Sequence, residues 1–433
     1  MKKVKIGLIG FGTVGTGVVK LLKRNKELIA EKTGVLPVIE KIADLDITTD
    51  RGVEIPDGIL TTNINDVLNN PDIDVVIELV GGTTYARDFV EKALKNGKAV
   101  VTANKALLAD CGEDLFNLAY EKSLDFYYEA SVAGGIPIIK ALRESLSSNN
   151  INTVYGILNG TCNYILSRME DEGTAFDEIL KDAQKAGYAE ADPTFDIDGI
   201  DTAHKTIVLA SLAFGNWFNM DDVHVEGIRG IDLLDFKYAA KLGYRIKLLS
   251  IIKNTSDGIE MSVRPTLVPA DSLIGSVHGV YNCVWINSDW LGNSMYYGQG
   301  AGEKATASAV VSDVIDIALN LKNNASNRIP AFTKGTRFKG LLGEENSRGR
   351  FYLRIQLANR PGVFGEIATV FGEYGISLAS VDQKEIDQNK KMAQVVVLTH
   401  DANQNSLNSA LEKIRQFDEA GKNIVVFKIE DFE

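Results

Sequence analysis

A glycine-rich loop near the start of the chain constrains the fold more than any other feature of the sequence. The apolar run at residues 4–9 leads into the segment GFGTVG, and apolar residues recur at helical spacing over residues 16–24. In such a strand–loop–helix unit, the first glycine allows a tight turn and the second lets the backbone approach a pyrophosphate. The third glycine lets the helix pack on the strand. We therefore predict a dinucleotide-binding unit whose cofactor contacts include Gly10, Gly12, Thr13, Val14 and Gly15.

The rest of the N-terminal region alternates between strand and helix patterns. Further strands are predicted at residues 38–43, 74–80, 99–102 and 126–130, and residues 84–96 have the pattern of an amphipathic helix. This alternation predicts a doubly wound parallel sheet of the Rossmann type.

Three polar residues follow the predicted strands, where open α/β sheets bind their ligands. Thr102 ends one strand and Lys105 lies just past it, where an exposed loop lysine is the alternative interpretation. Asp44 ends the 38–43 strand and would bind a ribose 2′-hydroxyl, whereas Arg51 would favour a 2′-phosphate. The sequence therefore leaves the preference between NAD and NADP open.

Charge and composition exclude several classes of protein. A net charge of −12 without any basic tract argues against nucleic acid and anionic membranes as partners. No apolar run approaches the ~18 residues of a membrane span. The three cysteines are scattered without a CxxC pair and the four histidines are dispersed. These features favour a reducing cytoplasm and argue against a transition-metal site.

An acidic stretch at residues 187–205, GYAEADPTFDIDGIDTAHK, is the second constraining feature. Its five carboxylates repel one another, so they must be solvated, metal-bound or arranged around a cationic or hydroxylated ligand. From residue 200 the apolar spacing is helical, so Asp201 and Lys205, four residues apart, lie on one helix face. An acidic surface loop with an ordinary ion pair is the alternative that this stretch alone leaves open.

Three further segments have the composition of ligand loops. The turn SVAGGIP at 131–137 follows Glu129, and several carbonyls beside a carboxylate suit a hard monovalent or divalent cation. A tight crossover between domains is the alternative. Asn159 begins the segment NGTCN at a helix start, where it either faces a pocket or caps the helix. The segment YGQGAG at 297–302 opens a helix at 303–321, whose N-terminus suits a phosphate or the substrate.

The C-terminal part of the chain begins again as a compact unit. Residues 322–348 are polar and predict a linker, and residues 349–433 have the βαββαβ order of a ferredoxin-like domain. We therefore divide the chain into a dinucleotide-binding domain at 1–133 and an α+β domain for substrate binding, catalysis and dimerisation at 134–321. The last helix of the second domain is predicted to return to the first.

In combination, these segments resemble homoserine dehydrogenases of the monofunctional type with a C-terminal ACT domain. The resemblance rests on six segments in order: GFGTVG (10–15), TANKA (102–106), EASVAGGIP (129–137), NGTCNYI (159–165), GYAEADP with its following DGID…K (187–205), and YGQGAG (297–302). The first alone is unspecific, whereas the six in this order are highly specific and cover nearly the whole chain. The resemblance implies an NAD(P)H-dependent, reversible reduction of L-aspartate 4-semialdehyde to L-homoserine, on the route to threonine, methionine and isoleucine.

The resemblance also implies roles for individual residues. Lys205 matches the proton donor of the family and Lys105 a second active-site lysine. Glu190 and Asp201 match carboxylates that bind the substrate, and Asp196 matches the acidic residue beside them. The substrate carries an ammonium group, so a carboxylate cluster suits it, and hydride delivery to an aldehyde requires a cation and a proton at the oxygen.

Two further sets of positions follow from the resemblance. Gly187 and Gly302 match cofactor contacts, and a structural sodium ion is implied at Glu129, Val132, Gly134 and Ile136. Two departures from the family pattern are visible. Many relatives have proline where Gln299 stands, and relatives commonly have basic residues where Asp44–Asp46 is acidic. We therefore predict that NAD is accepted at least comparably with NADP.

The C-terminal unit is expected to regulate the enzyme. Its turn Asn359-Arg360-Pro361-Gly362-Val363 opens a helix, as the ligand loop of ACT domains does, and free N–H groups there suit an α-carboxylate. The resemblance implies threonine as the effector and a homodimer or homotetramer as the regulated form. Burial of surface between subunits is the alternative role of this unit.

Two other functions compete with this interpretation. An aspartate-semialdehyde dehydrogenase would need a cysteine nucleophile with a histidine base, and Cys162 is the only candidate. A non-enzymatic amino-acid sensor would combine a dinucleotide-binding domain with an ACT module, but it would not need the set of carboxylates and lysines.

Overall fold

The computed structural model describes residues 1–335, 338–384 and 392–432. The chain forms two compact units, each built from three segments. Unit 1 comprises Met1–Leu158, Ala203–Asp221 and Tyr281–Phe338. Unit 2 comprises Asn159–Thr202, Asp222–Val280 and Lys339–Glu433. No helix in the described part of the chain is long and apolar enough to cross a membrane.

A six-stranded parallel sheet forms the N-terminal part of unit 1. Its strands follow the order β3-β2-β1-β4-β5-β6, the doubly wound order predicted from the sequence. They are β1 (Lys2–Ile9), β2 (Val35–Ala43), β3 (Leu60–Thr61), β4 (Val75–Glu78), β5 (Ala99–Thr102) and β6 (Phe126–Tyr127). The central strands β4 and β5 are buried along their whole length because helices cover both faces of the sheet.

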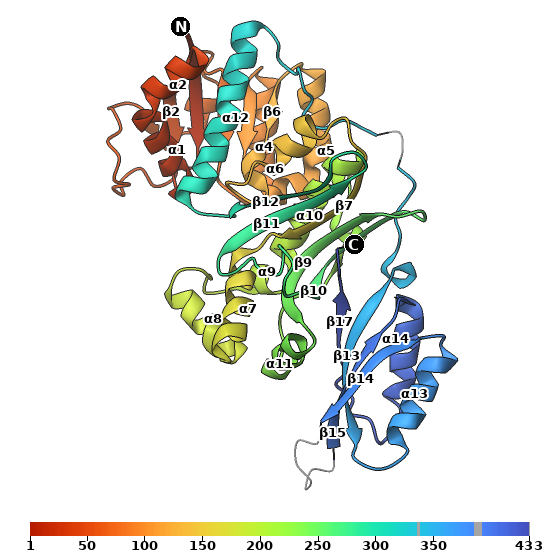
Figure 1. The fold of residues 1–433 in the computed structure, drawn as a ribbon. Coiled ribbons are helices and arrows are strands. Elements are labelled where there is room, and N and C mark those ends of the chain that lie inside the picture. Colours follow the sequence, from red (N-terminus) through yellow and green to blue (C-terminus); the bar gives the residue numbers. More distant parts are fainter. Residues whose placement is uncertain (336–337, 385–391, 433) are drawn as a thin grey trace. The chain divides into compact units, whose positions relative to one another are not determined.

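The helices of this sheet include one from far along the chain. They are α1 (Thr13–Arg24), α2 (Lys26–Thr33), α3 (Asn65–Leu68), α4 (Thr84–Lys95), α5 (Lys105–Glu121) and α12 (Glu303–Asn323). Figure 1 shows α12 lying against the N-terminal sheet. Ala307, Val310, Val314 and Ile317 of α12 share one apolar core with β1, β4 and β5. The end of the α+β region therefore contributes to the core of the dinucleotide-binding sheet.

The predicted strand at 126–130 ends at Tyr127 in the structure. The next residues form a 3₁₀ turn, η1 (Glu129–Ser131), because the backbone N–H of Glu129 donates to Asp313 of α12 instead of to a neighbouring strand. A short helix α6 (Ile138–Lys140) and a π-helical turn η2 (Ala141–Ser145) follow. Unit 1 also contains an antiparallel sheet of β7 (Ile151–Ile157), β11 (Tyr281–Ser288) and β12 (Gly292–Gln299).

Unit 2 contains the acidic stretch and the C-terminal region. Its helices before residue 280 are α7 (Gly160–Glu172), α8 (Phe176–Lys185), α9 (Thr194–Ile197) and α11 (Leu233–Lys241). Helix α10 (Ile200–Phe214) starts in this unit, and a 3₁₀ turn η3 (Met220–Asp222) follows it. The strands β8 (His224–Val225), β9 (Tyr244–Asn254) and β10 (Ile259–Pro269) form a sheet in which β9 and β10 are antiparallel.

The C-terminal region has the ferredoxin-like order that the sequence predicts. After a 3₁₀ turn η4 (Glu344–Asn346) come β13 (Arg348–Ala358), α13 (Val363–Glu373), β14 (Leu378–Lys384), β15 (Met392–Thr399), β16 (Ala402–Asn403), α14 (Gln404–Ile414) and β17 (Val425–Ile429). The sheet order is β17-β13-β15-β14, and α13 and α14 cover one face of it (Figure 1).

This domain is joined to the preceding sheet of unit 2 by backbone pairing. Strand β17 lies parallel to β10, with Thr266 opposite Lys428 and Leu267 opposite Ile429. The linker pattern at 322–348 gave no indication of this pairing. The ferredoxin-like sheet therefore continues the sheet that contains β9 and β10.

Candidate active site

The loop between β1 and α1 has the geometry of a pyrophosphate site. Gly10 has a φ of 98°, which favours glycine, and a Cβ on Gly15 would lie 2.2 Å from the carbonyl oxygen of Gly10. A Cβ on Gly12, the N-cap of α1, would meet nothing within 4 Å. Thr13 and Val14 are the first residues of α1. The loop thus leaves open space at a helix N-terminus, which suits a dinucleotide phosphate.

The carboxylate of Asp44 folds towards this loop. It accepts hydrogen bonds from the backbone N–H groups of Phe11 and Asp46, so it lies at the end of β2 beside the glycine turn. Arg51 forms an ion pair with Asp46, with an Nη2–Oδ2 distance of 3.1 Å. The pKa of Asp46 is depressed mainly by hydrogen bonds from Thr49 and Thr48. The negative charge of Asp46 therefore offsets the positive charge of Arg51, the residue that could favour a 2′-phosphate.

A buried carboxylate that the sequence analysis did not single out organises the segment around Lys105. Glu78 ends β4 with no exposed surface, and it accepts a hydrogen bond from Thr102 Oγ1 at 2.6 Å. Thr102 Oγ1 in turn accepts from the N–H of Asn104, and Asn104 caps α5. Burial raises the pKa of Glu78, although Thr102 and two backbone N–H groups oppose that shift. The sequence feature that could have identified Glu78 is a single acidic residue near the end of an apolar strand, shortly before Gly81-Gly82.

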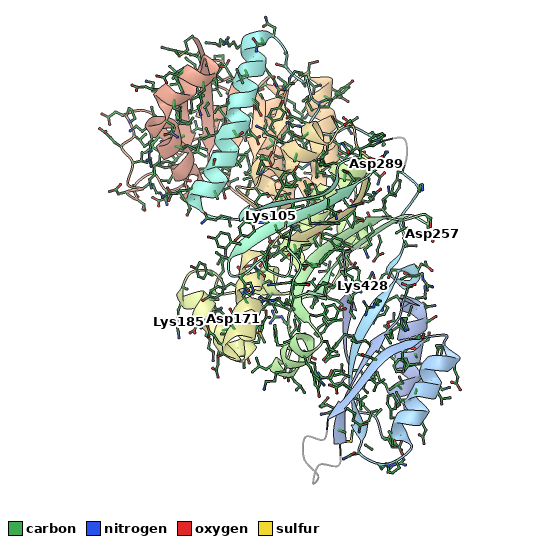
Figure 2. All side chains as sticks on the ribbon, viewed as in Figure 1. Lys105, Asp171, Lys185, Asp257, Asp289 and Lys428 are labelled. Carbon is green, nitrogen blue, oxygen red and sulfur yellow. The ribbon has the colours of Figure 1, made fainter. Side chains whose placement is uncertain are left out.

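This network holds Lys105 at the first position of α5, where its side chain is half-buried (Figure 2). Asn104 Oδ1 accepts from the N–H of Leu107, and Asn104 Nδ2 donates to the carbonyl of Gly82. Both bonds anchor the loop that carries the lysine. Lys105 therefore follows directly from the carboxyl end of β5, as the sequence predicts.

Glu129 lies in a buried acidic pair. One carboxylate oxygen accepts from the N–H of Ile139 at 2.9 Å and the other from the N–H of Lys140 at 2.8 Å. Asp313 accepts from the N–H of Glu129. Burial, followed by the charge of Glu129, raises the pKa of Asp313 to about 8, and burial also raises the pKa of Glu129. Two buried carboxyl groups beside a turn rich in carbonyls form a donor set that fits a hard cation.

Two glycine-rich loops meet next to this pair. The N–H of Gly135 donates to the carbonyl of Gln299 at 3.1 Å, and a Cβ on Gly134 would lie 2.5 Å from the carbonyl oxygen of Gly300. Val132, Gly134 and Ile136 are buried in the first loop. Gln299 therefore contributes its backbone to this contact, a role that a proline at that position would also fill.

Two of the predicted cofactor glycines differ in their surroundings. Gly302 is the N-cap of α12 and has a φ of 110°, and a Cβ there would meet nothing within 4 Å. It therefore leaves open space at a second helix start. Gly187 has a φ of 75° and its N–H donates to the carbonyl of Gln184 at the end of α8. The helix end alone explains glycine at 187, so its cofactor contact stays a prediction.

The five carboxylates of the acidic stretch have three different environments. Asp196 and Asp201 are brought together by one amide: Asn159 Nδ2 donates to Asp196 Oδ1 at 2.7 Å and to Asp201 Oδ2 at 2.9 Å. Asn159 Oδ1 accepts from the N–H of Cys162, so this residue both caps α7 and bridges the two acids. The structure therefore confirms that Asn159 caps the helix, whereas its facing a pocket stays a prediction.

The other three acids of the stretch have different surroundings. Asp192 accepts from the N–H of Thr194, and Asp198 forms an ion pair with Arg229, so both have local structural partners. Glu190 is exposed on the loop after α8, where Gln184 holds its backbone carbonyl at 3.0 Å.

Lys205 is buried one turn after Asp201 in α10, with 9% of its surface exposed. Its Nζ donates to the carbonyl of Leu158 at 2.6 Å, the residue that precedes Asn159 in the chain. The predicted proton donor is thus held at the junction of β7 and α7, from which Asn159 reaches the two acids.

Cys162 does not have the environment of a nucleophile. It has no exposed surface, and its thiol donates to the carbonyl of Asp196 at 3.2 Å. All three cysteines are buried, and none of them is in a disulfide bond. Across the described ranges, no three His, Cys, Asp or Glu residues form a group that could hold a metal ion.

Comparisons with known proteins agree over nearly the whole chain. Family models match residues 10–129 (homoserine dehydrogenase, NAD binding domain), 137–315 (homoserine dehydrogenase) and 351–419 (ACT domain). A homoserine dehydrogenase from Pseudomonas aeruginosa is 44% identical over 435 residues, which cover 99% of each chain.

Solved structures give the same result. The crystal structure of a homoserine dehydrogenase from Thiobacillus denitrificans matches with a TM-score of 0.94 and 42% identity, covering 100% of this chain and 99% of that one. A hyperthermophilic archaeal homoserine dehydrogenase in complex with NADPH matches with a TM-score of 0.61 and 28% identity. It covers 73% of this chain and 98% of its own.

Proposed function

The chain belongs to the homoserine dehydrogenase family of NAD(P)-dependent oxidoreductases, and from this premise we propose which of its residues carry out the reaction. The reaction is the reversible reduction of L-aspartate 4-semialdehyde to L-homoserine. The observation that carries the proposal is the double hydrogen bond of Asn159 to Asp196 and Asp201, one helical turn before the buried Lys205.

The carboxylates of Asp196 and Asp201 bind the α-ammonium group of the substrate. The Asn159 amide donates to both carboxylates, and a bound ammonium group would reduce the repulsion between their negative charges. Glu190 on the adjoining loop contributes a third carboxylate from its exposed position. These residues orient the substrate by its ammonium group.

When bound, the reduced nicotinamide supplies the hydride that adds to the aldehyde carbon. Lys205 donates the proton that the aldehyde oxygen gains, and its bond to the Leu158 carbonyl holds the ammonium in place. Lys105 provides a second positive charge that stabilises the developing negative charge on that oxygen. Its anchorage through Asn104, Thr102 and Glu78 fixes this position.

The dinucleotide is held by Gly10, Gly12, Thr13, Val14 and Gly15 at the start of α1, with Thr102, Gly187 and Gly302 as further contacts. Asp44 at the end of β2 binds the ribose hydroxyls. Because Asp46 offsets Arg51, we expect NAD to be used at least comparably with NADP. A kcat/KM ratio of about a hundredfold or more in favour of NADP would contradict this assignment.

We also propose that a structural sodium ion is held by Glu129 with the carbonyls of Val132, Gly134 and Ile136. The burial of Glu129 beside Asp313 supports this, because burial raises the pKa of both carboxyl groups and a bound cation would favour their ionised forms. Activity and thermal stability should fall when sodium is replaced by a bulky organic cation. Unchanged values would remove the sodium ion from the proposal.

The C-terminal ACT domain is proposed to bind threonine at the turn 359–363, within a homodimer or homotetramer. The turn ends at Gly362, which has a φ of 95° and is the N-cap of α13, so free N–H groups are available to a carboxylate. The three buried cysteines, none of which is in a disulfide bond, support a location in the reducing cytoplasm. We also propose that the chain has four parts: a dinucleotide-binding domain at 1–133, a substrate-binding, catalytic and dimerisation domain at 134–321, a linker at 322–348 and an ACT domain at 349–433.

Steady-state kinetics of substitutions at the proposed site test this assignment. Lys205→Ala should lose most of its kcat, whereas Asp201→Ala and Glu190→Ala should mainly raise KM for homoserine. Lys185→Ala, an exposed lysine of α8, is the matched control and should leave both constants unchanged. Near-native kcat for Lys205→Ala at its optimum pH would transfer the proton-donor role to Lys105.

A further inference from the structure

One face of β10 carries a row of buried polar side chains. Glu260, Ser262, Arg264 and Thr266 alternate along the strand, and each is at most 4% exposed. Side chains two residues apart point to the same face of a strand. Lys428 of β17 lies opposite Thr266 and is also buried, so it extends this row into the ferredoxin-like domain.

The charges in this row have partners in unit 2. Lys428 forms an ion pair with Glu260. Arg264 Nη2 lies 3.1 Å from Glu226 Oε1 and 2.7 Å from Glu344 Oε1. Both cations of the row, Arg264 and Lys428, therefore have carboxylate partners.

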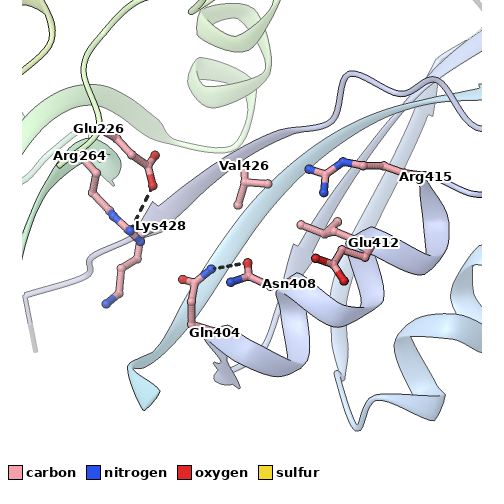
Figure 3. A pocket seen from close by; sticks show the side chains of 9 residues that line it. Glu226, Arg264, Gln404, Asn408, Glu412, Arg415, Val426 and Lys428 are labelled. Atoms are coloured by element: carbon pink, nitrogen blue, oxygen red, sulfur yellow. Dashed lines mark hydrogen bonds and ion pairs between the residues drawn. The ribbon is translucent and has the colours of Figure 1, made fainter. Parts of the chain in front are cut away.

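A cavity of about 300 Å³ lies between this row and helix α14. Figure 3 shows Arg264, Glu226 and Lys428 at one end, with Gln404, Asn408 and Glu412 projecting from α14 and Arg415 following its last residue. Glu412 and Arg415 are exposed at its rim, whereas Arg264 and Gln404 are 4% and 7% exposed. The cavity is thus lined by both β10 and α14.

Two buried polar atoms of the lining residues have no hydrogen-bond partner. Arg264 Nε is a donor without an acceptor, and Gln404 Oε1 is an acceptor without a donor. The other amide atom of Gln404 is engaged, since Nε2 donates to Asn408 Oδ1 at 3.0 Å. Buried polar groups are nearly always paired, so an unmet donor and an unmet acceptor in one cavity indicate a bound species.

We propose that this cavity binds a free α-amino acid. Its carboxylate accepts from Arg264 Nε, and its ammonium group donates to Gln404 Oε1, with Glu412 at the rim supplying a negative charge. A lone anion would leave Gln404 unmet, and a lone cation would leave Arg264 unmet. The site is separate from the turn at 359–363, and it does not depend on that turn binding threonine.

Occupation of the cavity would link the core sheet to the ACT domain. The ligand contacts β10 through Arg264 and α14 through Gln404, so it stabilises the docking of α14 on the strand pair β10–β17. The ACT domain then has a ligand site on the side that faces β10.

Calorimetry on the full-length protein tests the proposal with glycine, L-threonine, L-methionine and L-isoleucine. We expect at least one of these amino acids to bind, and binding should weaken at least about tenfold in Gln404→Leu and Arg264→Lys. Arg264→Lys retains the positive charge and removes the Nε donor. Gln416→Leu, an exposed position just after α14, is the matched control and should bind like the unmodified protein.

Two half-ligands separate the zwitterion from simpler occupants. The amino alcohol of the bound amino acid lacks the carboxylate and its N-acetyl derivative lacks the ammonium, so neither should bind. No binding by any of the four amino acids would overturn the proposal and leave water as the occupant. Equal binding by Gln404→Leu and Gln416→Leu, with folding verified by thermal unfolding, would overturn it as well.

Two variants distinguish the cavity from the proposed threonine site at 359–363. Loss of binding in Asn359→Ala alone assigns the amino acid to the turn and overturns the cavity site. Loss in Gln404→Leu alone supports the cavity and removes the turn. Activity without added amino acids should be the same in all these variants, because none of the substituted residues belongs to the proposed catalytic set.

Discussion

At the scale of single residues, one amide decides how the acidic stretch is used. Asn159 satisfies the start of α7 with its oxygen and bridges Asp196 and Asp201 with its nitrogen. Without the bridge, the two carboxylates would lose a donor that they share. The sequence alone does not distinguish the five acids of the stretch, whereas the Asn159 amide binds two of them, Asp196 and Asp201.

We expect Asn159→Ala to raise KM for homoserine about tenfold or more, because the two carboxylates lose the geometry that binds the ammonium. The lost cap should also cost about 1 kcal/mol of stability. Steady-state kinetics and chemical denaturation measure the two effects. Asn403→Ala, the N-cap of α14, is the matched control that should lose stability alone. An unchanged KM in Asn159→Ala would contradict the bridging role.

The cysteines give a second prediction at this scale. Burial raises the pKa of the Cys111 thiol from 9.0 to about 11, so almost no thiolate forms at pH 8 in the folded state. Since the unfolded thiol ionises at lower pH, this group reduces the stability of the fold as pH rises from 9 to about 11.

We therefore expect activity to survive treatment with iodoacetamide at pH 8, and all three thiols to react once the chain is unfolded in urea. Mass spectrometry of the labelled protein, alongside residual activity, measures both. Rapid inactivation of the native enzyme with one label on Cys162 would instead favour a nucleophilic cysteine, as in an aspartate-semialdehyde dehydrogenase.

At the scale of elements, two glycines at the start of α1 have different roles, one in ligand binding and the other in folding. Gly12 has an ordinary φ of −72° and open space at its Cβ position, whereas a Cβ on Gly15 would meet the Gly10 carbonyl at 2.2 Å. The same motif thus contains one glycine that leaves room for phosphate and another that lets the helix approach the loop.

Gly12→Ala should keep its thermal stability but raise KM for the dinucleotide about tenfold or more, because the methyl group enters the space for the pyrophosphate. Gly15→Ala should lower the melting temperature or prevent folding. Thermal unfolding and cofactor kinetics of the two variants, compared side by side, test this division. Equal cofactor KM in Gly12→Ala and the unmodified enzyme would be inconsistent with phosphate binding at that position.

At the scale of the whole molecule, the ACT domain is attached within unit 2 by more than a linker. Arg354 of β13 lies 2.6 Å from Asp235 of α11, and Tyr352 donates to the same carboxylate, which has no exposed surface. Lys428 pairs with the buried Glu260. Removing the domain would leave two buried carboxylates without their cations, which is costly in free energy.

A chain truncated after Arg348 should therefore lose inhibition by millimolar threonine, remain active, and unfold at a lower temperature than the full-length enzyme. Adding Asp235→Asn and Glu260→Gln to the truncated chain should recover part of the stability, because the unpaired charges are removed. Melting temperatures and threonine titrations of activity measure these effects. If the full-length enzyme ignores threonine and every other pathway amino acid, the regulatory role fails and a structural role remains.

The sequence by itself determined the local elements and the family. The glycine loops, the helix at 200–214 and the βαββαβ order follow from backbone sterics and from the spacing of apolar residues over short stretches. These are short-range effects, so the pattern at each site was sufficient. The shortened β6 is the exception, since a bond to Asp313 nearly two hundred residues later ends it.

Only the tertiary structure decided which polar residues act together. The buried Glu78 beneath Thr102, the pairing of Asp196 with Asp201, and the contact of the Gly134 and Gly300 loops join residues that are distant in the chain. The parallel pairing of β17 with β10 and the cavity beside it have the same origin. Periodicity shows which side chains share a face, but a hydrogen-bond partner across the fold depends on how the faces meet.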